Sequence, residues 1–186
     1  MIYSIILLLL SGIFILTAAA SIRVRGRTDL LPKLIRIPRD KTTGMILTAA
    51  VLIWCIPHAK VVLPVNAGGF FGLIVGTALV FVLLCAYLDY LPARAFAVIC
   101  ILGSYTMLNL TFARAVPCSI FLVTACYLTG IFGIVLSARP HWMRLILQNI
   151  VLKKAYRTAV CLFCLYTGAA CAFTSIVYLF AMHSAK

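Results

Sequence analysis

The sequence contains no glutamate, and its only acidic residues are Asp29, Asp40 and Asp89. General acid–base catalysis by paired carboxylates therefore has almost no material in this chain. Charged residues of both signs make up only 10% of the sequence, whereas a soluble domain carries about 25%. The sequence signatures of phosphate-binding loops, dinucleotide-binding folds, zinc peptidases and serine hydrolases are also absent. These absences disfavour an enzyme, and the sequence predicts neither a cofactor nor a metal site.

Long polar segments are scarce as well. Hydrophobic residues make up 65% of the chain and the mean hydropathy is +1.18, whereas soluble domains are about 45–50% apolar. The longest polar connection is about 20 residues, which is too short to fold alone. We therefore expect residues 1–186 to form a single integral membrane domain.

Six apolar stretches are long enough to be transmembrane helices, so we expect an all-α bundle of six spans. These stretches are residues 2–20, 43–63, 68–88, 95–112, 118–138 and 158–182. The second stretch is the least regular, because Pro57, His58 and Lys60 interrupt it. Either a helix kinked at Pro57 continues to about residue 63, or a short helix is followed by a re-entrant segment.

The net charge of +13 is concentrated in the connections between these stretches. Six crossings place residues 22–41, 89–94 and 139–157, with thirteen of the sixteen Lys and Arg residues, on one side of the membrane. The positive-inside rule assigns that side to the cytoplasm and leaves both termini outside. The pattern is typical of a bacterial inner-membrane protein. Because membrane topology explains the charge, we expect no nucleic-acid partner.

The two basic cytoplasmic loops, 21–42 and 139–157, have different patterns. In the second loop Arg144, Gln148 and Lys153 share one helical side, and Trp142 lies on another. This pattern predicts an amphipathic helix in the headgroup layer between the fifth and sixth spans, anchored by Trp142. We expect contacts with anionic lipid headgroups or a partner protein from Arg23, Arg25, Arg27, Lys33, Arg36, Arg39, Trp142, Arg144, Lys153 and Lys154.

Glycines recur at helical spacing in two of the spans. Gly68, Gly72 and Gly76 follow each other every four residues in the third span, and Gly130 and Gly133 lie in the fifth. A face of small residues lets the backbone of another helix approach closely. We therefore expect these five glycines to be helix-packing positions.

Three polar side chains near membrane segments allow a structural and a functional interpretation. Lys60 extends its amine to the headgroups, or it forms an outer anion or quinone site in which His58 donates a hydrogen bond. Asp89 pairs with Arg94 to stabilise a turn, or it takes part in proton or cation passage. The structural interpretation is preferred in each case.

Histidine and cysteine pairs suggest redox chemistry as a further alternative. His58 and His183 are potential axial ligands of a haem, which requires imidazoles facing each other across the bundle. Cys161 and Cys164 form a CxxC motif that is able to exchange disulfides with a partner or a quinone. The predicted topology places this motif at the reducing, cytoplasmic side, which favours packing residues instead.

These observations favour a non-catalytic accessory subunit of a larger membrane complex, which contacts other membrane subunits through its glycine faces and basic loops. One alternative is a small transporter or channel subunit for an anionic or neutral solute. Its polar pathway would be built from Thr77, Ser104, Thr106, Asn109, Thr124 and Tyr127. A less favoured alternative is the quinone-, haem- or thiol-linked redox protein.

Overall fold

A computed structural model describes residues 2–23, 40–62, 67–88, 90–116 and 119–184 of the chain. These residues form helices and short turns, with no strand among them. The helices are α1 (Ile2–Arg23), α3 (Lys41–Val62), α4 (Ala67–Tyr87), α5 (Leu91–Ala113), α6 (Ile120–Ala138), α7 (His141–Leu152) and α8 (Lys154–Ser184). The prediction of an all-α protein is confirmed for the part of the chain described.

Five of these helices, α1, α3, α5, α6 and α8, are long and apolar enough to cross a membrane. Of the six predicted spans, five are thus confirmed, among the described residues, as helices of sufficient length and apolar composition to cross a membrane. The apolar stretch Phe71–Tyr87 of α4 is shorter. Helix α7 has 12 residues and is amphipathic, with apolar residues on one face and polar residues on the other. Helix α4, by contrast, is apolar on all sides.

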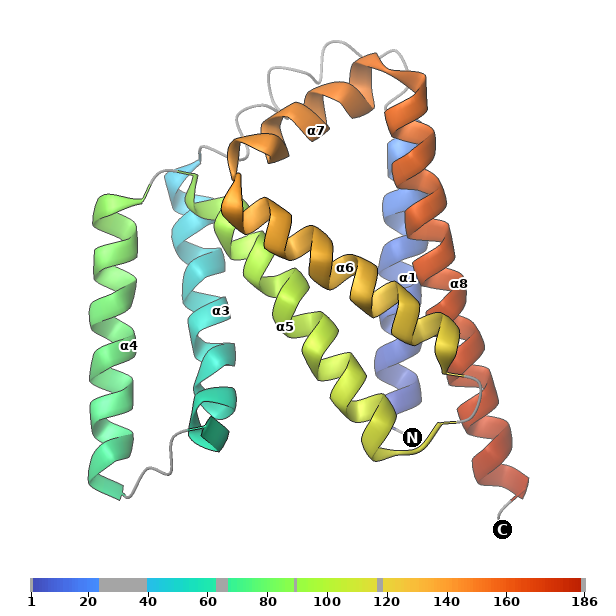
Figure 1. Ribbon diagram of the computed structural model, residues 1–186, viewed down its shortest axis with the longest axis horizontal. Helices are drawn as coiled ribbons and strands as arrows, with labels where there is room; N and C mark the ends of the chain where they lie inside the picture. Colours follow the sequence, from blue (N-terminus) through green and yellow to red (C-terminus); the bar gives the residue numbers. More distant parts are fainter. Residues whose placement is uncertain (1, 24–39, 63–66, 89, 117–118, 185–186) are drawn as a thin grey trace.

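The helices form an open arch rather than a closed bundle (Figure 1). The longest contact is between α1 and α8, which run antiparallel side by side. Helix α6 packs on α5 and also touches α8, and α5 in turn packs on α3. Helix α4 stands at the far edge, with α3 as its main neighbour, and α7 bridges from the end of α6 to the start of α8.

The α1–α8 pair packs through residues in a heptad-like pattern, most of which are small. The positions that face the partner alternate in steps of three and four residues, as in an antiparallel coiled coil. They are Ser4, Leu7, Ser11, Phe14, Ala18 and Ser21 in α1, and Cys161, Cys164, Gly168, Cys171, Ser175 and Tyr178 in α8.

Close approaches along α1 and α8 keep one register from end to end. The Ser175 hydroxyl donates a hydrogen bond to the Ser4 carbonyl oxygen at 3.1 Å. Further along, a Cβ added at Gly168 would lie 3.4 Å from the carbonyl oxygen of Ser11. Nearer the other end, Ala18 is completely covered in a cluster with two cysteines of α8. Small side chains thus permit backbone-to-backbone contact along most of the pair.

Helices α5 and α6 meet at a second small-residue contact. A Cβ added at Gly133 would lie 2.8 Å from the Ala97 carbonyl oxygen and 3.0 Å from the Cβ of Cys100. One turn earlier, a Cβ at Gly130 would lie 3.6 Å from the Cβ of Ser104, an ordinary contact distance. Position 133 therefore requires glycine, whereas position 130 has room for a methyl group.

Helix α3 is continuous through its proline. It begins after Asp40, whose carboxylate accepts a hydrogen bond from the Thr43 hydroxyl, and it passes Pro57 to end at Val62. Of the two interpretations of this stretch, the structure contains the continuous helix. Near its start a Cβ at Gly44 would lie 2.9 Å from the Cδ of Pro92, so α3 and α5 are in close contact there.

A polar and aromatic cluster joins α1, α5 and α8 at the end of the molecule that carries both termini (Figure 1). The Tyr3 hydroxyl lies 2.9 Å from Thr111 Oγ1. Because Thr111 Oγ1 donates to the Met107 carbonyl oxygen, the Tyr3 hydroxyl is the donor to Thr111. The Arg114 guanidinium lies 4.5 Å from the centre of the Tyr3 ring, which meets Tyr178 edge-on at 5.1 Å. This cluster closes the core where the helix ends converge.

Candidate functional site

Cationic side chains gather at the end of the molecule opposite the termini. The ends of α1 and α6, the starts of α3, α5 and α8, and all of α7 lie at this end (Figure 1). The cations on or next to these segments are Arg23, Lys41, Arg94, Arg139, Arg144, Lys153, Lys154 and Arg157. By contrast, Arg114 follows α5 at the other end. We call the end opposite the termini the basic end.

Five of the ten residues predicted to contact lipid or a partner belong to the part of the chain that the structure describes, and all five lie at the basic end. Arg23 closes the last turn of α1, where a cation interacts favourably with the helix dipole. Trp142 and Arg144 lie on α7, and Lys153 and Lys154 connect α7 to α8. Arg25, Arg27, Lys33, Arg36 and Arg39 lie outside the described residues.

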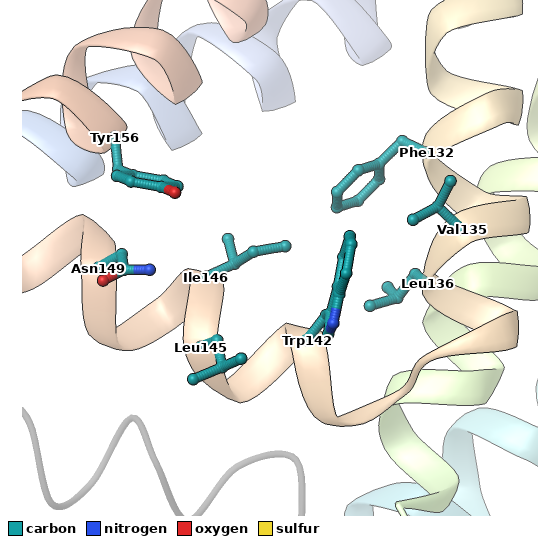
Figure 2. A pocket seen from close by; sticks show the side chains of 8 residues that line it. All are labelled: Phe132, Val135, Leu136, Trp142, Leu145, Ile146, Asn149 and Tyr156. Atoms are coloured by element: carbon teal, nitrogen blue, oxygen red, sulfur yellow. The ribbon is translucent and has the colours of Figure 1, made fainter.

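The basic end contains an apolar cavity of about 370 Å³ between α6, α7 and α8 (Figure 2). Residues at spacings of three and four on α7 place one face of this helix toward it, and Phe132 of α6 points toward Trp142 across the space. Its lining is Phe132, Val135 and Leu136 of α6, Trp142, Leu145, Ile146 and Asn149 of α7, and Tyr156 of α8. We call this space the α7 cavity.

Two cations flank the α7 cavity through its aromatic lining. The Arg139 guanidinium lies 5.2 Å from the centre of the Trp142 ring, and the Lys153 amine lies 5.8 Å from the centre of the Tyr156 ring. Both distances are within the range of cation–π contacts. The amide of Asn149 adds a hydrogen-bonding group near Tyr156 (Figure 2). The arrangement combines an apolar interior with positive charge at two sides.

A second cavity, of about 360 Å³, lies at the basic end among α3, α4 and α5. Its lining is more polar than that of the α7 cavity and includes Lys41, Tyr87 and Tyr90 together with the close-packed residues Leu91 and Pro92.

The glycines predicted to pack helices form two groups, those that contact another helix and those that do not. Gly133 and Gly130 face α5. A Cβ added at Gly72 or Gly76 of α4 would meet nothing within 4 Å. Gly68 lies in the first turn of the same helix. Within the described residues, the contact surface of α6 is occupied and that of α4 is open.

Cys161 and Cys164 lie in the α1–α8 contact. Both are free thiols, each 9% exposed, and both pack with Ala18 and the partly buried Phe14. The three-residue spacing of the CxxC motif therefore coincides with one step of the heptad-like pattern of α8. This environment is that of small apolar packing residues.

The remaining polar candidates are not brought into one site. The ring of His58 meets the Tyr105 ring of α5 edge-on, with 5.6 Å between ring centres. The end of α3 that carries His58 and the end of α8 that carries His183 lie on different sides of the molecule (Figure 1). Lys60 belongs to the last turn of α3, and Asp89 lies outside the described residues.

The side chains proposed for a polar pathway lie on separate surfaces of α4, α5 and α6. Thr77 belongs to α4, whereas Asn109, Thr124 and Tyr127 are exposed on α5 and α6. The hydroxyls of Thr77, Thr106 and Thr124 each donate to a carbonyl oxygen of their own helix. Ser104 is buried opposite Gly130. These side chains do not line a common passage in the described structure.

Two features of the structure were not foreseen from the sequence. The α1–α8 contact had a detectable signal, because Ser4, Ser11 and Ala18 recur every seven residues and α8 has a matching series of small residues. The α7 cavity had only a partial signal in the sequence. The amphipathic pattern identifies the face of α7 with Trp142, but it does not indicate that α6 and α8 border an open space on that face.

Comparison with known proteins identifies no relative: no family model, curated protein or solved structure matches the chain significantly.

Proposed function

We propose that this protein is a non-catalytic subunit of a larger membrane assembly, and that α4 is the helix that contacts a partner subunit. The observation that carries the proposal is the open glycine face of α4, where added Cβ atoms at Gly72 and Gly76 meet nothing within 4 Å. Gly133 and Gly168 are covered by a neighbouring helix. Gly12 of α1 and Gly103 of α5 are open, but they are single glycines and not a repeated pair.

The proposed topology has six crossings, with α4 as the additional one and α7 lying in the headgroup layer. Helix α4 has 21 residues from Ala67 to Tyr87, which corresponds to about 31 Å at 1.5 Å per residue. The gathering of cations at the basic end supports its placement in the cytoplasm, with both termini outside, in a bacterial inner membrane.

The exposure of α4 further supports a partner on the glycine face. Its less exposed residues lie toward one side and are Leu73, Thr77, Phe81, Leu84 and Cys85. Gly72 and Gly76 are exposed and lie on another side of the helix. Large apolar side chains alone are compatible with lipid contact, but a groove of glycines favours close approach of a second helix.

Purification from native membranes tests the proposal. A tagged chain, extracted in mild detergent, is expected to co-purify with at least one other integral membrane protein identified by mass spectrometry. In the double variant Gly72→Leu/Gly76→Leu we expect loss of that protein, because the leucines fill the groove. The chain itself is expected to remain monodisperse by size-exclusion chromatography.

Ala78→Leu provides the matched control, since Ala78 is also an exposed small residue of α4 but lies on a different side. This variant is expected to retain the partner. Recovery of the unaltered chain as a lone monomer, or retention of the partner by the double leucine variant, would contradict the proposal.

A further inference from the structure

We propose that the α7 cavity is a binding site for one anionic phospholipid, with an acyl chain against its apolar lining and an anionic headgroup attracted by Arg139 and Lys153 at its two ends. This site is separate from α4 and does not depend on whether the protein has a partner subunit. The inference rests on three features of the cavity: its lining, the charges beside it and its size.

The lining matches an amphiphile rather than a polar solute. Phe132, Val135 and Leu136 of α6 form one wall, and Leu145 and Ile146 of α7 face them (Figure 2). Small-molecule sites in proteins commonly have this composition, with an apolar interior and a few polar groups that orient the ligand. The polar groups that do line it belong to Trp142, Asn149 and Tyr156.

The charges select an anion. Arg139 and Lys153 lie over the two aromatic residues at opposite sides of the cavity, and both are exposed. None of the eight lining residues is acidic. Arg139 precedes α7 and Lys153 follows it, so each attracts an anionic headgroup from its own end of the cavity. A zwitterionic headgroup carries its own ammonium into the same space, so it gains less from the two cations.

The size limits what enters. A volume of about 370 Å³ is near the lower end of the 300–1,000 Å³ range of ligand pockets. It therefore accommodates part of one acyl chain below a headgroup rather than a complete two-chain lipid. The second chain lies outside the cavity, in the surrounding bilayer.

Tryptophan quenching provides a direct test, because the chain has two tryptophans, Trp54 and Trp142. The Trp54→Phe variant of the full chain leaves only the tryptophan that lines the cavity. In phosphatidylcholine nanodiscs, we expect brominated phosphatidylglycerol to quench Trp142 at about 25-fold lower mole fraction than brominated phosphatidylcholine, since each cation contributes about fivefold. In the Trp142→Phe variant, Trp54 of α3 is expected to respond equally to both lipids.

Charge variants in the Trp54→Phe background separate this site from general attraction to the basic end. Arg139→Gln and Lys153→Gln are each expected to reduce the preference for phosphatidylglycerol about fivefold. Lys154→Gln removes the same charge from the next, exposed residue and is expected to leave the preference within twofold. An equal loss in Lys154→Gln would contradict a defined site.

A cavity-filling variant tests the acyl-chain part. Val135→Phe is expected to reduce quenching by both lipids, whereas Ile134→Phe, at the adjacent exposed position outside the lining, is expected to leave it unchanged. Equal quenching of Trp142 by the two brominated lipids, or no saturable quenching by either, would overturn the proposal. The latter result would mean that the cavity takes another occupant or none, whatever the outcome for α4.

Discussion

Helices α6 and α4 carry similar small-residue spacings and use them differently. In α6, Gly133 lies so close to α5 that a single added carbon would stand 2.8 Å from the Ala97 carbonyl oxygen. In α4, Gly72 and Gly76 have open space where their side chains would be. Spacing of small residues therefore indicates that a helix is able to pack closely, and the arrangement of the other helices decides whether that ability is used within the chain.

The difference follows from the number of neighbours that each helix has. Helix α6 lies between α5 and α8, whereas α4 stands at the edge of the arch beside α3 (Figure 1). In a bilayer, lipid is as apolar as the side chains, so close packing rather than hydrophobic burial stabilises a helix pair. The contacts of α6 thus contribute to the stability of the isolated chain, whereas the glycine face of α4 does not.

The largest difference between the two helices is expected when Gly133 of α6 and Gly72 of α4 are each replaced by leucine. Gly133→Leu is expected to destabilise the protein by about 3 kcal/mol, because the added side chain meets the backbone of α5. Gly72→Leu is expected to leave the stability of the isolated chain unchanged. Thermal midpoints of the two purified variants, measured by fluorescence-detected size-exclusion chromatography, distinguish these outcomes. Similar midpoints would show that the closed α5–α6 contact is not the one described.

The second comparison concerns threonine hydroxyls. Thr111→Val is expected to cost about 2 kcal/mol, because it leaves the buried Tyr3 hydroxyl without its acceptor. The hydroxyl of Thr77 in α4 donates only to its own helix, at the carbonyl oxygen of Leu73. Thr77→Val is accordingly expected to change stability by less than about 0.5 kcal/mol. Denaturant titration in detergent measures both, and a reversed order would contradict the interhelical role of Thr111.

A smaller effect is expected from the hydrogen bond between α8 and α1. Ser175→Ala removes the donor to the Ser4 carbonyl oxygen while preserving the small volume that the contact requires. We expect a loss of about 0.6 kcal/mol, the average for interhelical hydrogen bonds in membrane proteins. The larger Ser175→Leu is expected to be much more damaging. If both variants have the same midpoint, close packing at this position is not important.

The smallest effect is expected from alanine at the open sites of α4. The double variant Gly72→Ala/Gly76→Ala adds two methyl groups that meet no neighbour, and alanine favours a helix over glycine by up to about 1 kcal/mol per residue in water. We expect an unchanged or slightly higher thermal midpoint for the isolated chain. A clear decrease would show that a second helix already occupies this face in the purified protein, as in a homo-oligomer.

Particular elements show how far sequence reasoning extends. The helices α1, α5, α6 and α8 were predictable because long uncharged runs have to satisfy their backbone hydrogen bonds internally in lipid. The continuity of α3 was not predictable, since the sequence around Pro57 is compatible with either a continuous helix or a break in it. Trp142 was identified as an interfacial residue, but its position in a cavity with Phe132 and Tyr156 depends on residues far apart in the chain.

The glycine and cysteine predictions illustrate the same limit. All five glycines were predicted to be helix-packing positions, and only the structure separates Gly133 from Gly72 and Gly76. Cys161 and Cys164 had both a redox and a packing interpretation, and the structure places them with Ala18 in the α1–α8 contact. In each case the missing information was the identity of the neighbouring helix.

Composition and run length act locally along the chain, so they were sufficient to predict apolar helices with cations gathered between them. The fold was needed to show which helix faces are covered, which remain open, and where α6, α7 and α8 leave a cavity between them. The physical reason is that close packing depends on which helix happens to lie opposite, and a chain of nearly uniform hydropathy carries little record of that choice.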